Sequence, residues 1–380
     1  MQMNRYAKKA LSVHKKLQGK IGITPKVTIE NKEDLSIFYT PGVGAVSSYL
    51  AEHKNEMSRY TMKGNTVAVV SDGSAVLGLG NIGPEGALPV MEGKAMLFKV
   101  LANIDAFPIV LATQNIDEIV ETVERIAPVF GGINLEDIAA PACFEIEEKL
   151  RKKLAIPVFH DDQHGTALVV LAGLMNAARV VERKFESLRV VVNGAGAAGQ
   201  AIAELLLRAG IKDITLLDSK GIIGPKRRDL DSFKQKLLQK TNPRRIDGDL
   251  TAALEGAQAV IGVSRAGAIT PEHIGFMDNK SIVFALANPI PEIMPEIARA
   301  AGARVVATGR SDFPNQINNS LGFPGIFRGA LDHKVRTITD AMLVQAARNL
   351  AQLVKCPTRD HIIPHTFDKR VVAAVAKAIQ

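Results

Sequence analysis

The chain has 380 residues, of which 47% are hydrophobic, which is too apolar for a disordered protein and ample for two cored domains. Its two cysteines, Cys143 and Cys356, lie far apart and outside any C-x-x-C spacing, which excludes a disulfide framework and a cysteine-rich zinc site. The net charge is +8, but the basic residues are scattered and there is no tryptophan, which argues against nucleic-acid binding. We expect a cytoplasmic protein whose mildly positive field attracts small anions.

Neither the N-terminus nor the longest apolar run predicts a membrane segment. Residues 1–17 repeat apolar residues at helical spacing among lysines, but they lack the continuous apolar core of a signal peptide. The apolar run at 167–175 is about half the length needed to cross a bilayer, and Gly173 interrupts it. We expect a buried helix there.

Short apolar runs alternate with amphipathic stretches along the chain. Helical patterns separate several of these runs, as at 116–127 and 142–154. Such continuous runs are typical of parallel strands that are buried on both faces, so the fold class is α/β. The predicted strands lie within 66–72, 107–113, 132–138, 156–162, 188–194, 213–218, 259–264, 282–289 and 304–309.

No Gly/Ser-rich linker or internal repeat marks a domain boundary, so we place it by motif, directly after "FHDD" at 159–162. Residues 1–162 are predicted to form an N-terminal α/β catalytic domain with a parallel sheet, which holds substrate and metal. Residues 163–380 are predicted to form a Rossmann-type dinucleotide-binding domain.

The stretch "VVVNGAGAAGQAIAELLLRAG" has the pattern and the context of a dinucleotide-binding fingerprint. An apolar strand precedes Gly194, Gly196 and Gly199, and a helix rich in alanine and leucine follows them. These glycines permit a tight turn, close approach to a pyrophosphate, and packing of helix on strand. Asp218 ends the next strand, where it can accept hydrogen bonds from the adenosine ribose.

An earlier G-x-G-x-x-G match, at Gly78, Gly80 and Gly83, lacks that context. Pro84 follows the third glycine and Pro89 lies shortly beyond it, so we expect a loop and no helix opening at Gly83. This match does not predict cofactor binding, although such a loop can shape a substrate pocket.

The segment "FHDDQHGT" at 159–166 resembles the H-E-x-x-H site of a zinc peptidase. That site needs both histidines one turn apart on a helix, with a glutamate as general base. Here His160 is predicted to end a strand, His164 precedes the next helix, and the glutamate is absent. We therefore interpret both histidines as packing or supporting residues.

Acidic residues follow two of the predicted strands. Glu136 and Asp137 follow one strand, and Asp161 and Asp162 follow another. Ligands of open parallel sheets bind beyond the carboxyl ends of the strands, so Glu136, Asp137 and one of the two later aspartates can converge there. A hard divalent cation such as Mg²⁺ or Mn²⁺ would relieve their repulsion; helix capping is the alternative role for these acids.

Seven motifs, in order over nearly the whole chain, resemble those of malic enzymes, of the short prokaryotic type. Besides the dinucleotide fingerprint they are "FYTPGVG" at 38–44, "GLGNIGPEGALPVMEGKA" at 78–95, "NLEDI" at 134–138, "FHDDQHGTA" at 159–167, "ALANPIPE" at 285–292 and "NNSLGFPG" at 318–325.

The resemblance implies oxidative decarboxylation of L-malate to pyruvate and CO₂ with reduction of NAD(P). Lys94 matches the general base, and Asp161 matches the acid that positions it. We expect burial and a nearby metal to lower the pKa of Lys94, so that it is neutral when it takes the hydroxyl proton. Tyr39 matches the acid that protonates enolpyruvate.

The resemblance also implies the binding residues. Glu136, Asp137 and Asp162 match the metal ligands, for Mg²⁺ or Mn²⁺, and Asn288 and Asn318 match amides that contact substrate and the nicotinamide ribose; Lys94 also belongs to the substrate site. The predicted cofactor-binding residues are Thr166, Gly194, Ala195, Gly196, Ala197, Ala198, Gly199, Asp218 and Asn288.

Two features leave the chemistry open. Larger family members have a substrate-binding arginine where this chain has Ala75. Asp218 favours NAD, whereas the basic run that follows favours NADP, so we expect NAD with NADP as the alternative. The basic residues of that run are Lys220, Lys226, Arg227 and Arg228.

We expect a homodimer or a higher homo-oligomer that acts on small molecules, L-malate and pyruvate, and binds neither nucleic acid nor membrane. Three rival functions share part of the pattern. A malolactic-type enzyme would end at lactate, a nucleotide sensor would not need Tyr39, Lys94 and the acids together, and a metal-free hydroxyacid dehydrogenase would use a histidine base.

Overall fold

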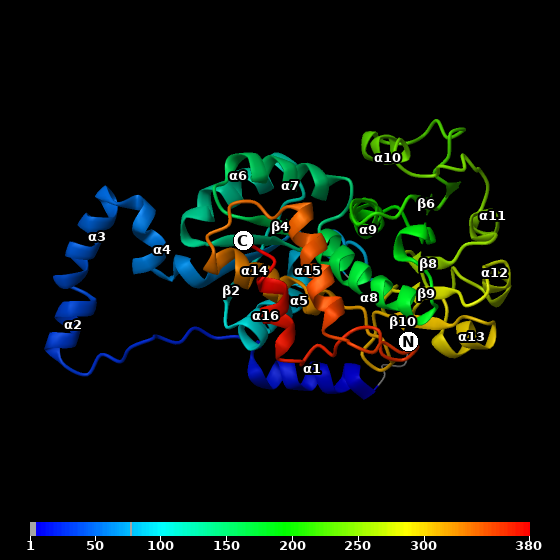
Figure 1. The fold of residues 1–380 in the computed structure, drawn as a ribbon. Helices are drawn as coiled ribbons and strands as arrows, with labels where there is room; N and C mark the ends of the chain where they lie inside the picture. Colours follow the sequence, from blue (N-terminus) through cyan, green and yellow to red (C-terminus); the bar gives the residue numbers. More distant parts are fainter. Residues whose placement is uncertain (1–4, 77) are drawn as a thin grey trace.

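A computed structural model describes residues 5–76 and 78–380. Two mainly parallel sheets stand side by side in it, with helices packed around them, and a separate arm of helices extends from one end (Figure 1). The α/β fold class is therefore confirmed.

The first sheet has the strand order β2-β1-β3-β4, and every pairing in it is parallel. Its central strand β1 is buried at every residue, as its continuous apolar sequence predicts. Val67 and Val69 face one core, and Ala68 and Val70 face a second core on the opposite side. The strands are β1 (Thr66–Ser71), β2 (Asp105–Val110), β3 (Gly132–Leu135) and β4 (Val158–His160).

Helices α6 (Ile116–Ile126) and α7 (Ala142–Lys153) supply the core on one face of this sheet, and α5 (Gly83–Ala102) contributes to the core on the other. The first two helices were predicted. The third corrects our expectation of a loop, because α5 begins at Gly83. Pro84 occupies a first-turn position, where its missing N–H costs nothing, and this long helix tolerates Pro89.

The second sheet has the order β10-β9-β8-β5-β6-β7, and all its pairings are parallel except that of β6 with β7. All nine predicted strands of the two sheets are present in the described chain, and the short strand β7 is an addition. The strands are β5 (Arg189–Asn193), β6 (Asp213–Asp218), β7 (Gly221–Ile222), β8 (Ala259–Gly262), β9 (Ile282–Ala285) and β10 (Val305–Thr308).

The apolar run at 167–175 is buried within helix α8 (Thr166–Val180), as predicted, and helix α9 (Ala197–Arg208) follows the glycine fingerprint. The remaining helices between the strands of this half are short. They are α10 (Ser232–Leu238), α11 (Leu250–Leu254), α12 (Pro271–Gly275) and α13 (Pro295–Ala300).

The C-terminal helices return to the first sheet. Their bounds are α14 (Phe323–Asp332), α15 (Asp340–Gln352) and α16 (Arg370–Ala376). Phe323 and Phe327 of α14 lie 4.7 and 5.4 Å from the ring of Phe98 in α5, and Phe327 lies 5.9 Å from Phe159 in β4. The division at residues 162 and 163 stays a prediction, since the end of the chain packs against elements on the other side of it.

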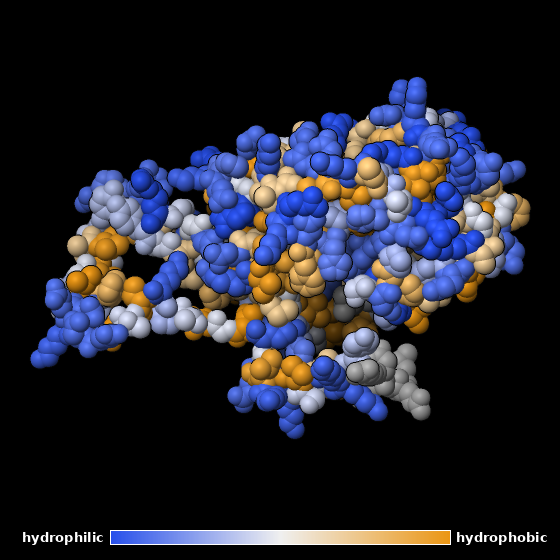
Figure 2. All heavy atoms as spheres, turned by 60° about the horizontal axis from the view of Figure 1, so that its bottom comes forward, coloured by the Kyte–Doolittle hydropathy of each residue, from blue (hydrophilic) through white to orange (hydrophobic). Residues whose placement is uncertain are grey.

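The N-terminal arm comprises residues 5–65 and has no core of its own. No residue from Tyr6 to Asn65 is buried, and α2 and α3 lie far from the sheets (Figure 1). Many of its apolar side chains face solvent, as the orange atoms of this region show (Figure 2). Its helices are α1 (Arg5–Leu17), α2 (Lys32–Phe38), α3 (Gly42–Glu52) and α4 (Met57–Tyr60).

Among the described residues, no helix is both long enough and apolar enough to cross a membrane.

Candidate active site

Three carboxylates meet where two neighbouring strands end. Glu136 and Asp137 follow β3, and Asp162 follows β4, its partner in the sheet. One oxygen from each of these acids lies within 4.8 Å of the others. The backbone N–H of Asp137 also donates to Oδ2 of Asp162 at 2.8 Å, which fixes the two loops together.

The backbone of both loops is shaped for this convergence. Asp137 has a φ of 54°, in the left-handed region, which turns the chain sharply after β3. Residues Asp161–Gly165 form a π-helical turn after β4. A side chain on Gly165 would collide with the carboxylate of Asp161, so a larger residue there would displace the carboxylate that Lys94 contacts.

Lys94 reaches this cluster from α5. It lies on the buried face of the helix with Met91 and Phe98, and only 7% of it is exposed. Its Nζ donates to Oδ2 of Asp161 at 2.6 Å and lies 2.7 Å from Oε1 of Glu136. The ring of Phe323 covers the ammonium at 4.2 Å.

The surroundings of Lys94 act on its pKa in opposite directions. Burial lowers the pKa of Lys94, but the neighbouring carboxylates, Asp161 foremost, outweigh burial and raise it above its ordinary value. Burial raises the pKa of Asp161 and that of Glu136 to about 7, against the opposing attraction of Lys94. The surrounding carboxylates therefore hold Lys94 in its charged form in the described structure.

The two histidines do not form a zinc-peptidase site. His160 ends β4 with its ring fully buried, and burial lowers its pKa to about 4. His164 lies in the π-helical turn, and its Nε2 is 2.9 Å from Oε2 of Glu147. Neither histidine belongs to the group of three acids that could hold a metal.

Glu147 is a site residue that the sequence did not reveal. It is buried on α7, and it accepts hydrogen bonds from the backbone N–H of His160 at 3.0 Å and forms an ion pair with Arg151 at 2.8 Å. Burial raises the pKa of Glu147, but His164 and Arg151 outweigh burial and lower it to about 2. This carboxylate therefore fixes the turn that carries Asp161 to α7. The only signal for Glu147 in the sequence was its position four residues before Arg151, the spacing of a helical ion pair.

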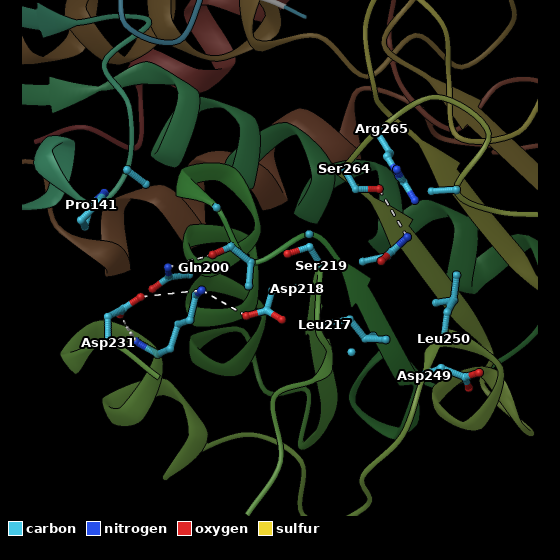
Figure 3. Close-up of a pocket in the computed structure, with 18 of the residues that line it drawn as sticks. Pro141, Gln200, Leu217, Asp218, Ser219, Asp231, Asp249, Leu250, Ser264 and Arg265 are labelled. Carbon is cyan, nitrogen blue, oxygen red and sulfur yellow. Dashed lines mark hydrogen bonds and ion pairs between the residues drawn. The ribbon is translucent and has the colours of Figure 1, made fainter. Parts of the chain in front are cut away.

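A cavity of about 620 Å³ lies at the carboxyl ends of β5 and β6 (Figure 3). Ala140 and Pro141, in the loop that follows β3, line one side of it. Gly194, Ala195, Gly196 and Asp218 are the predicted cofactor-binding residues that line it. The others, Thr166, Ala197, Ala198, Gly199 and Asn288, do not.

Each fingerprint glycine has a distinct structural reason. Gly194 has a φ of 128°, and a side chain there would strike the backbone of Val263. A side chain on Gly199 would collide with the carbonyl of Gly194 across the turn, whereas one on Gly196 would meet nothing. The open space above Gly196 suits close approach of a pyrophosphate to the helix N-terminus.

The two asparagines that were predicted to contact substrate lie beyond β9 and β10. Asn288 is exposed after β9, and Asn318 caps the short helix Asn319–Leu321 by accepting from the N–H of Ser320 at 2.9 Å. A side chain on Gly78 would collide with the carbonyl of Asn288, so the earlier glycine-rich loop packs against this residue. Ala75 donates its backbone N–H to the carbonyl of Asp137 at 3.0 Å.

Tyr39 is not part of this cluster within one chain. It follows α2 in the N-terminal arm, with 65% of its surface exposed, and the arm extends away from α5 (Figure 1).

Comparison with known proteins decides the family. Models of the N-terminal domain and of the NAD-binding domain of malic enzyme match residues 18–151 and 163–379. The chain belongs to the malic enzyme family. The resemblance drawn from its motifs is therefore confirmed, and this malic enzyme is an NAD(P)-dependent malate oxidoreductase.

Known malic enzymes match this chain over nearly its whole length. It is 55% identical to the bifunctional malic/malolactic enzyme of Bacillus subtilis, over 97% of its own length and 91% of that protein. It is 52% identical to the NAD-dependent malic enzyme of Geobacillus stearothermophilus, over 95% of its own length and 76% of that protein. The crystal structure of NAD-dependent malic enzyme from Thermotoga maritima superposes with a TM-score of 0.94 and 51% identity, covering 97% of this chain and 98% of that one.

Proposed function

We propose that this malic enzyme converts L-malate to pyruvate and CO₂ with reduction of NAD, using Lys94 and the acids around it. The observation that carries this proposal is the burial of Lys94 between Asp161 and Glu136, at 2.6 and 2.7 Å, in a chain whose glycine fingerprint lines a cavity of about 620 Å³. A buried lysine that is held in place by two carboxylates is positioned for proton transfer to and from a substrate.

Glu136, Asp137 and Asp162 are fitted to hold a divalent cation. All three offer carboxylate oxygens, which lie within 4.8 Å of one another, and the side chain of Asp162 is partly open to solvent. Such a set suits Mg²⁺ or Mn²⁺ with positions left for substrate. The ion would polarise the C2 oxygen of malate and, by compensating Glu136, would lower the pKa of Lys94.

The protein's own residues then carry two proton transfers. Nζ of neutral Lys94 takes the C2 hydroxyl proton. A bound nicotinamide would supply the acceptor for the C2 hydride, so that malate becomes oxaloacetate. Asp161 holds Nζ in place and shares its proton. After the bond from C3 to the departing carboxylate breaks, enolpyruvate takes a proton at C3 from the hydroxyl of Tyr39, which yields pyruvate.

Tyr39 can take part only if the arm of a second copy delivers it. The arm has no buried residue between Tyr6 and Asn65, and helices as short as α2 are marginal in water without a surface to pack on. We therefore propose a two-fold symmetric homodimer that exchanges arms, so that the partner's Tyr39 reaches the Lys94 site. An exposed apolar rim near the site, at Leu79, Ile82 and Ile290, offers a surface to receive it.

We propose NAD as a cofactor because Asp218 ends β6 inside the cavity, with NADP as the alternative. A cytoplasmic location is also proposed, because both cysteines are free thiols, which suits a reducing compartment. Malolactic conversion of malate to lactate is a second candidate activity, since the relative from Bacillus subtilis is named for both reactions.

The central experiment is a malate assay with NAD and with NADP, each with and without Mn²⁺, in which pyruvate and lactate are quantified. Pyruvate formation in step with cofactor reduction, dependent on Mn²⁺, is the expected result. Lactate without net reduced cofactor would favour the malolactic reaction, and metal-independent turnover would refute the role of the acids.

Arm exchange has its own test in mixed dimers of Lys94→Ala and Tyr39→Phe chains, each inactive alone. If Tyr39 acts across the interface, every hybrid dimer has one intact site, so random reassociation restores about a quarter of the wild-type sites. If Tyr39 acts within its own chain, each site of a hybrid carries one of the changes and mixing restores nothing.

A further inference from the structure

Glu292 is a buried carboxylate that is held by hydrogen-bond donors alone. It has no exposed surface, and among the described residues it forms no ion pair. Its Oε1 accepts from the backbone N–H of Ser264 at 2.8 Å and lies 3.5 Å from the hydroxyl of that residue, and its Oε2 accepts from the backbone N–H of Ala287 at 3.0 Å. Burial raises the pKa of Glu292 and outweighs these hydrogen bonds, which lower it. Burial of an acid without a counter-charge is costly, so its contacts indicate a role besides packing.

These contacts join the ends of two neighbouring strands. Ser264 follows β8 and Ala287 follows β9, and the two strands pair in parallel. The backbone of the same segment extends the connection, since the carbonyl of Glu292 accepts from the N–H of Ile269 at 3.2 Å. Glu292 therefore holds the chain at both ends of the cavity loop, which we define as residues 263–268.

The cavity loop forms part of the wall of the 620 Å³ cavity, whereas Glu292 itself does not line it. Ser264 and Arg265, both labelled in Figure 3, line the cavity together with Ala268. Nδ2 of Asn193 donates to Oγ of Ser264 at 3.3 Å, a bond that Figure 3 draws as a dashed line from Ser264. Asn193 ends β5, directly before the glycine fingerprint. The carboxylate therefore positions both the loop and its contact with the fingerprint turn.

Gly262, the last residue of β8, provides the space that this carboxylate occupies. A β-carbon on Gly262 would lie 2.6 Å from Cδ of Glu292 and 2.8 Å from its Oε1. The carboxylate can retreat from such an atom only by lengthening its hydrogen bonds, because both of its oxygens are engaged. A methyl group at Gly262 is therefore an independent way to displace the carboxylate without removing its charge.

We propose that Glu292 is a positioning residue for the nicotinamide half of the dinucleotide. Asp218 ends β6 and the fingerprint follows β5, so a dinucleotide with its adenosine at Asp218 and its pyrophosphate at the fingerprint extends toward β8 and β9. The cavity loop lies in that direction, and Glu292 holds it in place before the cofactor binds. Without this carboxylate the cofactor must itself order the loop, and the cost of that ordering weakens binding. The inference rests on the proposed function only in placing a dinucleotide in this cavity.

The test measures binding of NADH by fluorescence titration and of adenosine 5′-monophosphate by calorimetry. Neither measurement needs malate or metal, so failure of the malate reaction cannot affect them, and the monophosphate reports on the adenosine half alone. Glu292→Gln keeps the size of the side chain, but its amide oxygen can accept from only one of the two loops while its NH₂ group faces the other. NADH is expected to bind this variant about tenfold more weakly, and the affinity for the monophosphate to change by less than about twofold.

Glu296→Gln is the matched control, because Glu296 lies in the first turn of the nearby helix α13 and is exposed. It should leave both affinities unchanged, whereas Gly262→Ala should reproduce the selective loss of NADH. The ratio of the two affinities decides the test, because a loss of stability alone, seen as a lower thermal midpoint, reduces the folded fraction for both ligands equally. The proposal is overturned if Glu292→Gln binds NADH as tightly as the wild type does, or if it weakens both ligands equally. Binding of neither ligand by the wild type would refute the dinucleotide site itself, and the role of Glu292 with it.

Discussion

Replacement of Lys94 by methionine tests the electrostatics at the centre of the site. The change keeps the length of the side chain but removes the charge that lies 2.6 Å from Asp161 and 2.7 Å from Glu136. Both carboxyls are buried, so they must either be ionised without a counter-charge or be protonated. We expect the free energy of unfolding at about pH 8 to fall by about 3–5 kcal/mol, the usual cost of breaking a buried pair.

The sign of the pH dependence follows from the acids. Burial has already raised the pKa of Asp161 and of Glu136 to about 7, above their unfolded values, and removal of Lys94 raises both further. Acids with raised folded-state pKa values favour folding at low pH and oppose it as pH rises. The difference between wild type and Lys94→Met should therefore shrink when the pH is lowered from about 8 to about 5.5.

Urea denaturation followed by circular dichroism, in EDTA and at one protein concentration, measures both values. Lys99→Met is the matched control on the same helix, since Lys99 pairs with Asp105 at 2.9 Å but is 54% exposed. This control should change the free energy of unfolding by less than about 1 kcal/mol. Equal losses in the two variants, or a loss in Lys94→Met that grows toward acid pH, would refute the reasoning.

Three further predictions concern residues around the site. Asp162→Ala should abolish Mn²⁺ binding in calorimetric titration, whereas His160→Asn should retain it, because the predicted ligands are all oxygens; the opposite result would reopen a histidine site. Gly199→Ala should lower the thermal midpoint because its new methyl group collides with backbone, whereas Gly196→Ala should keep the midpoint but weaken NADH binding, as fluorescence titration can show. Glu147→Gln should destabilise the protein by about 2–3 kcal/mol near pH 7, a loss that fades as pH falls from the unfolded pKa toward about 2, and a pH-independent loss in urea denaturation would contradict the ion pairing.

The strands were predictable because a buried parallel strand needs little besides local sequence. Every residue of β1 that faces either core is apolar, so the sequence of this strand indicates that both of its faces are buried. Helix α5 was missed because Pro84 and Pro89 are strong local signals against a helix. Packing of its buried face against the sheet outweighs them.

The pairing of charges was not predictable from spacing. Lys94 and Asp161 lie 67 residues apart, and their hydrogen bond depends on the docking of α5 on the same sheet whose strand β4 leads into the turn with Asp161. The sequence predicts that burial lowers the pKa of Lys94, but it cannot show how many carboxylates surround the ammonium and raise that pKa in the described structure. The hydrogen bonds of Asp218 with Arg227 and with Lys234 of α10 likewise depend on how the chain after β6 folds back onto the end of that strand.

The exposed arm connects stability of the assembly to the chemistry of the site. Thirteen large apolar side chains between Ile21 and Met62 are exposed in one chain. Burying half of them, at about 1.5 kcal/mol each, would contribute about 10 kcal/mol per arm, and a symmetric dimer buries two arms. Association costs about 4–15 kcal/mol of free energy, and only once per dimer. Burial of both arms therefore outweighs this cost, whereas burial of one arm would roughly equal it. The surface that stabilises the dimer is then the same surface that carries Tyr39, and each Lys94 site obtains its proposed acid only in the assembled enzyme.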